Sequence, residues 1–159
     1  MKKIILTILV LSMLVLPACG KTNAAPGADS STVIEAGDTV GSKYLAAFAN
    51  SSANDAESVV AELLKLDAAG TELVEIPVSE GYLDGFRSDI TGFSKGVKFS
   101  PMIGSIPFVG YVFETDNPDA LLALLTENAD PAWNICTRAD ETVSYVRGNL
   151  VFFLMCFNE

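Results

Sequence analysis

Carboxylates and cysteines are the side chains from which this chain would have to build any reaction chemistry, because its 159 residues include no histidine. That absence excludes Ser-His-Asp and Cys-His nucleophiles, histidine zinc ligands and the commonest general acid or base. A phosphate-binding loop of the Gly-x-x-x-x-Gly-Lys-Ser/Thr type is also missing. We therefore expect no catalytic residue, no bound metal and no cofactor.

Three acids come closest to a catalytic pair. Asp84, Asp89 and Glu114 lie in or near a stretch rich in glycine and aromatic residues, and two facing carboxylates can hydrolyse a glycosidic bond. The competing interpretation is a solvated acidic surface, which a chain with 20 acidic residues must have. A carboxylate-dependent glycan hydrolase is therefore kept as the alternative to a non-enzymatic domain.

The N-terminus has the build of an export signal. Lys2 and Lys3 give it a positive start, and an apolar run follows over residues 4–16. A helix of that length rises roughly 20 Å, whereas the hydrocarbon core of a bilayer is roughly 30 Å thick. The segment is therefore predicted to direct export and not to span the membrane.

The sequence LPAC at residues 16–19 resembles the lipobox of bacterial lipoproteins, with an aliphatic residue three positions before the cysteine and a small residue directly before it. The resemblance implies that a diacylglycerol is attached to Cys19 and that cleavage makes Cys19 the new N-terminus. Two acyl chains anchor a protein stably, so we expect a lipid-anchored protein on the extracytoplasmic side of the cell membrane. Cleavage near Ala24 or Ala25, which would discard Cys19, is the alternative.

Composition divides the chain into a signal peptide at residues 1–18, a flexible tether at 19–41 and one domain at 42–159. The tether is rich in Gly, Ala, Ser, Thr and Asp, as flexible linkers are. Two of the ten basic residues leave with the signal, so eight face 20 acidic ones and the mature net charge is −12. We expect no nucleic-acid partner, because there is no basic stripe to bind phosphates.

Cys136 and Cys156 are the cysteines left once Cys19 is lipidated. An exported pair can form a disulfide, but both lie in apolar, strand-like runs, where a free cysteine behaves as a small hydrophobe. Both interpretations stay open.

Helices are predicted at three places. Residues 42–50 form a short helix with Ser42 as N-cap. A longer helix follows Asn54, which stands in capping-box spacing with Glu57, and it ends at Gly70, a residue suited to the left-handed position after a helix. A third starts where Asn117 can cap it and Pro118 can occupy its first turn.

Strands are predicted at residues 71–78, 106–114 and 132–137, and in a hairpin of residues 142–147 and 150–157. Pro77 cannot donate to a ladder, so the first of these is an edge strand or a strand end. The hairpin turn is Gly148-Asn149, a pair that suits a two-residue turn. The closing strand, LVFFLMCF, is apolar on both faces and is predicted to be a central strand covered on both sides.

Residues 81–106 resist assignment. They repeat a glycine–aromatic pairing and carry Tyr82, Phe86, Phe93, Phe99 and Met102. If these side chains stay exposed they form a binding patch for a partner or ligand; if they turn inward they belong to the core.

Together the elements predict a single small α+β domain, with two main helices packed on a largely antiparallel sheet. The helix–strand start, the segment PMIGSIPFVGYVFETDNPDALLALL and the closing GNLVFF, together with the lipobox, resemble small uncharacterised lipoproteins of Gram-positive gut bacteria and their DUF4358-type domain. That resemblance implies location but no activity.

The function expected is that of a membrane-anchored binding or scaffolding module whose partner is an envelope protein or a small ligand. A structural accessory subunit of an envelope complex is a further alternative.

Overall fold

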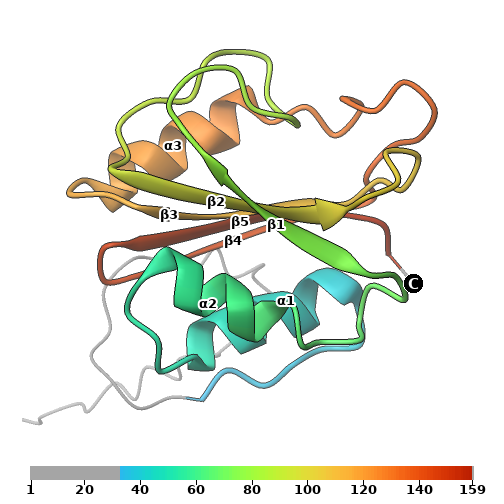
Figure 1. Cartoon of the computed structure of the whole chain (residues 1–159), viewed down its shortest axis with the longest axis horizontal. Helices are drawn as coiled ribbons and strands as arrows, with labels where there is room; N and C mark the ends of the chain where they lie inside the picture. Colours follow the sequence, from blue (N-terminus) through green and yellow to red (C-terminus); the bar gives the residue numbers. More distant parts are fainter. Residues whose placement is uncertain (1–32, 159) are drawn as a thin grey trace, which may run out of the picture.

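A five-stranded sheet forms the centre of the computed structural model, which describes residues 33–158 (Figure 1). The strands are β1 (Leu73–Val78), β2 (Lys95–Pro101), β3 (Val109–Glu114), β4 (Glu141–Arg147) and β5 (Leu150–Cys156), in the spatial order β1-β2-β3-β5-β4. Every neighbouring pair is antiparallel. The predicted α+β class with a largely antiparallel sheet is confirmed.

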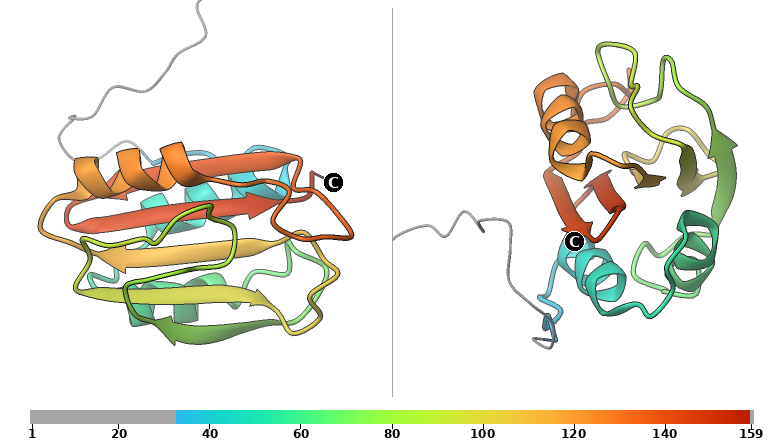
Figure 2. Two further views of the ribbon diagram at one scale, coloured as in Figure 1. Left: turned by 90° about the horizontal axis from the view of Figure 1, so that it is seen from above. Right: turned by 90° about the vertical axis from the view of Figure 1, so that its left-hand side faces the viewer.

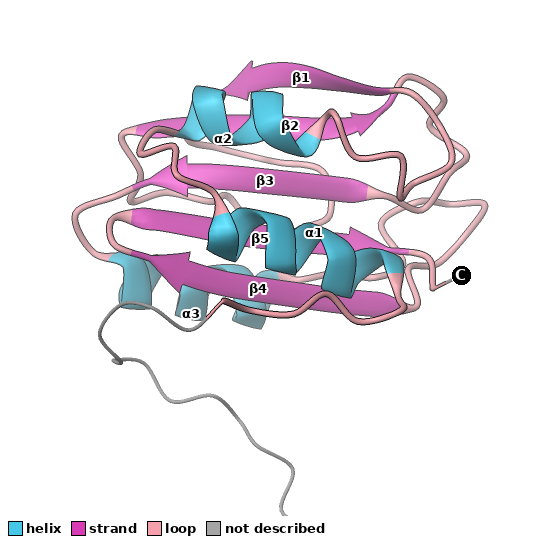
Figure 3. Cartoon of the chain, turned by 90° about the horizontal axis from the view of Figure 1, so that it is seen from below, coloured by secondary structure: helices cyan, strands magenta, loops and turns pink. Residues whose placement is uncertain are grey.

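Three helices cover the two faces of the sheet. α1 (Val40–Asn50) and α2 (Ala56–Leu63) lie on one face, and α3 (Pro118–Asn128) lies on the other, where the segment 79–94 covers the rest of that face (Figures 1 and 2). Figure 3 shows α1 and α2 lying over the strands. Two main helices were expected, but α1 has 11 residues, as many as α3.

Strand β5 supplies side chains to both hydrophobic cores. Leu150, Phe152, Leu154 and Cys156 belong to the core beneath α1 and α2. Their neighbours Val151, Phe153 and Met155 belong to the core beneath α3. Because successive side chains of a strand point to opposite faces, a strand covered on both sides must be apolar throughout. The prediction for this strand is confirmed, since all seven of its residues are buried.

The helix starts are partly corrected. Thr39, and not Ser42, caps α1 by accepting a hydrogen bond from the Ser42 backbone N–H. Asp55, and not Asn54, caps α2 in the same way through the Ser58 N–H. In each case the cap sits three residues before the amide that it satisfies, so the predicted caps were one to three positions away. The predicted end of the second helix at Gly70 is also wrong, because α2 ends at Leu63.

Other local predictions are confirmed. Asn117 caps α3 and Pro118 is its first residue. β4 and β5 pair as a hairpin around Gly148, whose φ of 60° lies in the left-handed region that glycine favours. β1 is an edge strand of the sheet, as Pro77 indicates.

The strand predicted at residues 132–137 is wrong, because this segment is a loop between α3 and β4. Side chains close its turns: the Asp130 carboxylate accepts from the Ala132 N–H, and the Asn134 side-chain oxygen accepts from the Cys136 N–H. Such local bonds compete with a strand ladder. Conversely, β2 arises inside the stretch that had no assignment. Within residues 33–158, no helix is long and apolar enough to cross a bilayer.

Candidate functional site

The predicted binding patch divides into core and surface. Phe86, Phe93 and Phe99 are buried, so for these rings the core interpretation holds. Tyr82 and Met102 are exposed, at 69% and 78%, but they lie in different loops. The patch as a whole is therefore not a single surface.

Residues 79–94, which contain the glycine–aromatic pairs, cover part of the core beneath α3, and we call this segment the lid. It closes on itself through a bridge between Gly81 and Ile90, and a bridge from Phe86 to Ala129 joins it to the end of α3. Gly85 has a φ of 90°, and a Cβ there would lie 2.5 Å from the Met155 methyl carbon. The positive φ favours glycine at this position, and any larger residue would also have to displace the end of the Met155 side chain.

A buried tyrosine and an ion pair hold this lid to the sheet. The Tyr111 hydroxyl donates to the Asp84 carbonyl oxygen over 2.8 Å, and the Lys98 ammonium lies 2.9 Å from the Asp84 carboxylate. Burial raises the pKa of Tyr111 well above its usual value, with the Asp84 charge adding to the effect. These groups hold the lid on the sheet, and the Tyr111 hydroxyl stays protonated as a hydrogen-bond donor.

The three candidate carboxylates are not brought together. Asp84 is in its ion pair on the α3 side of the sheet. Glu114 lies under the start of α2, where its carboxylate accepts from the Ala56 N–H over 2.9 Å. Asp89 is exposed in the lid loop. This arrangement gives no support to a glycosidase pair. Among residues 33–158 there is also no group of three or more Cys, Asp or Glu side chains that could hold a metal ion.

Residues 92–96, Gly-Phe-Ser-Lys-Gly, reproduce the letter spacing of the hydrolase nucleophile elbow. An elbow joins a strand to a helix and needs a histidine partner. Here the segment leads into strand β2, and the Ser94 hydroxyl donates to the Glu114 carbonyl oxygen. The match is therefore one of letters only.

The cysteines have separate environments. Cys136 and Cys156 are both free thiols, the first exposed and the second buried at the end of β5. Burial, together with the nearby Glu141 and Asp140 charges, raises the pKa of the Cys156 thiol to about 12. The predicted lipidation site, Cys19, lies outside the described residues.

An exposed apolar surface forms where two loops meet. Met102 and Ile103 follow strand β2 and are 78% and 65% exposed, and Ile135 in the α3–β4 loop is fully exposed. We call these three residues the apolar tip. Figure 1 shows the two loops, yellow and orange, together at the right-hand end of the molecule.

Hydrogen bonds brace the two loops against each other. The Asn134 side-chain amide donates to the Gly104 carbonyl oxygen, and the Thr137 hydroxyl donates to that of Ser105 over 3.3 Å. At the base of the second loop, the Ala139 N–H donates to the Pro131 carbonyl oxygen over 2.9 Å. Ile135 is thus kept out of the domain's own core by a hydrogen-bonded loop, so burying its side chain against another molecule would be favourable.

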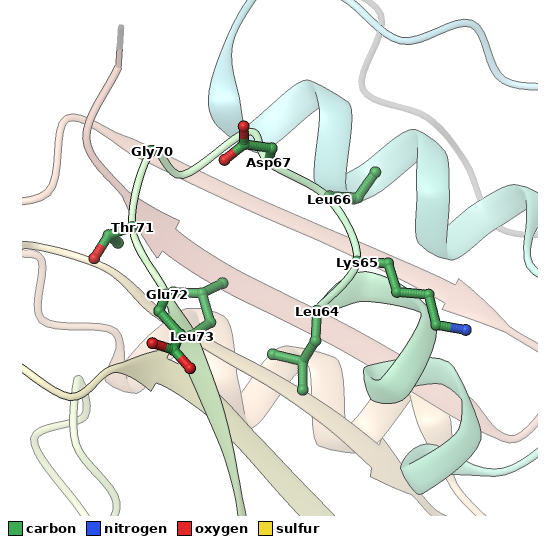
Figure 4. Close-up of a pocket in the computed structure, with 8 residues that line it drawn as sticks. All are labelled: Leu64, Lys65, Leu66, Asp67, Gly70, Thr71, Glu72 and Leu73. Atoms are coloured by element: carbon green, nitrogen blue, oxygen red, sulfur yellow. The ribbon is translucent and has the colours of Figure 1, made fainter.

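An open hollow of about 620 Å³ lies at the start of β1, formed by the loop that joins α2 to this strand (Figure 4). We call it the β1 hollow. Its lining residues are Leu64, Lys65, Leu66, Asp67, Gly70, Thr71, Glu72 and Leu73.

Sequence reasoning found Met102 but missed Ile103 and Ile135. The available signal was charge: residues 101–107 and 131–137 contain no charged side chain. Ile135 was assigned to a strand, and its exposure follows from side-chain turns that composition does not reveal.

The chain was also compared with known proteins. No protein-family model, no curated protein and no solved structure matches it.

Proposed function

We propose that this chain is a lipid-anchored, extracytoplasmic binding module that holds a protein partner through its apolar tip and performs no reaction itself. The observation that carries the proposal is the full exposure of Ile135 on a braced loop beside Met102 and Ile103. Exposed apolar clusters of this kind mark surfaces that another molecule covers. Rigid presentation lowers the entropy lost on binding.

The location rests on the N-terminal signal and the lipobox-like residues 16–19. A Cys19→Ala chain is expected to leave the membrane fraction and the detergent phase. Continued fractionation with membranes would contradict the lipid anchor.

Affinity capture from solubilised membranes tests the binding surface, with the tethered protein as bait. The triple variant Met102→Ser, Ile103→Ser, Ile135→Ser is expected to lose a protein that the unchanged chain retains. Tyr82→Ser is the matched control, because Tyr82 is also an exposed apolar side chain, at 69%, but lies outside the two tip loops. Equal capture by the triple variant would contradict the proposal, as would equal loss in the control.

A further inference from the structure

We propose that the apolar tip and the β1 hollow together receive one polypeptide segment, in which apolar side chains stand next to a lysine or arginine. This inference rests on the proposed function, because it specifies the partner of the same surface.

The tip and the hollow adjoin through the β1–β2 ladder. Leu73 faces Pro101 in the last pair of that ladder. Glu72 directly precedes Leu73, and Met102 directly follows Pro101. The acidic side of the hollow therefore begins where the apolar tip begins. A segment that covers Met102 is therefore within reach of the hollow.

The hollow carries negative charge that no basic residue of the described chain offsets by contact. Asp67 and Glu72 are exposed, and within residues 33–158 neither carboxylate has a hydrogen-bond donor or an ammonium or guanidinium group in contact. Figure 4 shows Lys65 on the opposite side of the hollow, pointing away from both carboxylates. A cation from a partner would meet two free carboxylates there.

The rim of the hollow is supported from inside the domain. The hydroxyl of the buried Tyr44 donates to the Leu66 carbonyl oxygen over 3.4 Å. Gly70, with a φ of 60°, makes the turn that brings Asp67 and Glu72 around the hollow. The carboxylates of Asp67 and Glu72 are therefore carried by a loop whose conformation is already set before a partner binds.

Charge also favours a polypeptide over a membrane as the occupant. The tip loops bear no charge, their neighbouring hollow is acidic, and the mature chain has a net charge of −12. An anionic lipid surface repels such a face, whereas a basic segment is attracted to it.

Peptide binding to the mature chain tests the inference. In a Cys19→Ala background, an environment-sensitive dye on Cys136 reports events at the tip, because Cys156 is buried. Two synthetic peptides with the same apolar centre, Leu-Ile-Phe-Leu, are compared, one flanked by lysines and the other by glutamates. The lysine peptide is expected to bind about tenfold more tightly, and the difference should shrink in high salt.

The double variant Asp67→Lys, Glu72→Lys is expected to remove most of this tenfold preference. Its matched control is Asp89→Lys, Glu127→Lys, which changes the net charge equally at two exposed acids away from the hollow. Loss of preference in both variants would overturn the inference, as would equal binding of the two peptides. Binding of neither peptide would also overturn the inference. A dye signal that changes with anionic phosphatidylglycerol vesicles but with neither peptide would overturn it in the same way.

The two proposals fail in different ways. If membrane capture is lost in the tip triple variant but unaffected by the Asp67→Lys, Glu72→Lys double variant, the tip stands as the binding surface and the basic partner is overturned. If capture is insensitive to the tip variant, the proposed function fails first.

Discussion

The ring of Phe99 lies directly over the backbone of Gly110, its neighbour across the β2–β3 pair. A Cβ at position 110 would collide with this ring, whereas one at Gly104 would meet open space. We expect Gly110→Ala to lower the free energy of unfolding by about 1–3 kcal/mol and Gly104→Ala to change it by about 0.5 kcal/mol or less. Urea unfolding measures both values, and equal effects would contradict this packing.

Three buried weak acids, Cys156, Tyr44 and Tyr111, make stability depend on alkaline pH, because burial raises the pKa of each. Burial is the main cause that raises the pKa of Cys156 from 9.0 to about 12 and that of Tyr44 from 10.0 to about 12. Between pH 9 and 12 the unfolded chain therefore releases protons that the folded chain keeps, and stability falls as pH rises.

Urea unfolding at several pH values checks this window. Stability should not change through these three groups below pH 9 and should then decline towards pH 12. Cys156→Ala is expected to be less stable throughout, because it leaves a cavity, but to decline less steeply above pH 9. Identical slopes for the variant and the unchanged chain would show that the thiol does not contribute.

The direction of single side chains was the least predictable feature. The glycine–aromatic pairs have no regular period, so the sequence left open whether Phe86, Phe93 and Phe99 were surface or core. Their burial depends on contacts far along the chain, such as the bridge from Phe86 to Ala129. The exposure of Ile135 likewise depends on distant residues, since its loop is hydrogen-bonded to Gly104 and Ser105.

At the scale of elements, those with strong local signals were predictable. The cap and proline of α3, the glycine turn of the β4–β5 hairpin and the unbroken apolar run of β5 all act within a few residues. Strand β2 was not recognised, because lysines at 95 and 98 and a glycine at 96 hide its alternation. Only its pairing between β1 and β3 makes it a strand.

Hydrogen bonds hold the segment of residues 34–39 near both ends of α1. Near its start, the Asn50 side-chain amide exchanges two hydrogen bonds with the Ile34 backbone, of 3.0 and 2.7 Å. At its end, the Glu141 carboxylate accepts from the Thr39 hydroxyl and from the Gly41 N–H. This arrangement sets the point from which the preceding chain leaves the domain.

Asn50→Ala should free the start of this segment. Because both lost hydrogen bonds are exposed, we expect a cost of about 1 kcal/mol or less but faster hydrogen exchange of the Ile34 amide, whose N–H donates to the Asn50 side chain. Asn54→Ala is the matched control, since Asn54 is exposed and its side chain makes no hydrogen bond within the described residues. Unchanged exchange in the Asn50 variant would contradict the role of this contact.

At the scale of the whole molecule, the chain enters the domain far from the apolar tip. Ile34 is bound to the last residue of α1, Asn50. The first residues of α1 are held by Glu141, which pairs with Cys156 at the tip end of the sheet. Figures 1 and 3 both show this separation. With the lipid anchor proposed above, the domain would be attached at the end opposite to the apolar tip.

Photo-crosslinking from the tip tests this account most directly. The mature chain with Cys19→Ala, carrying a benzophenone on Cys136, is irradiated with membranes of the producing cell, and adducts are identified by mass. We predict one protein adduct, which is lost when Met102, Ile103 and Ile135 are changed to serine and kept in Tyr82→Ser. Adducts with lipid alone, or the same protein adducts with and without the apolar tip, would contradict a protein-binding module.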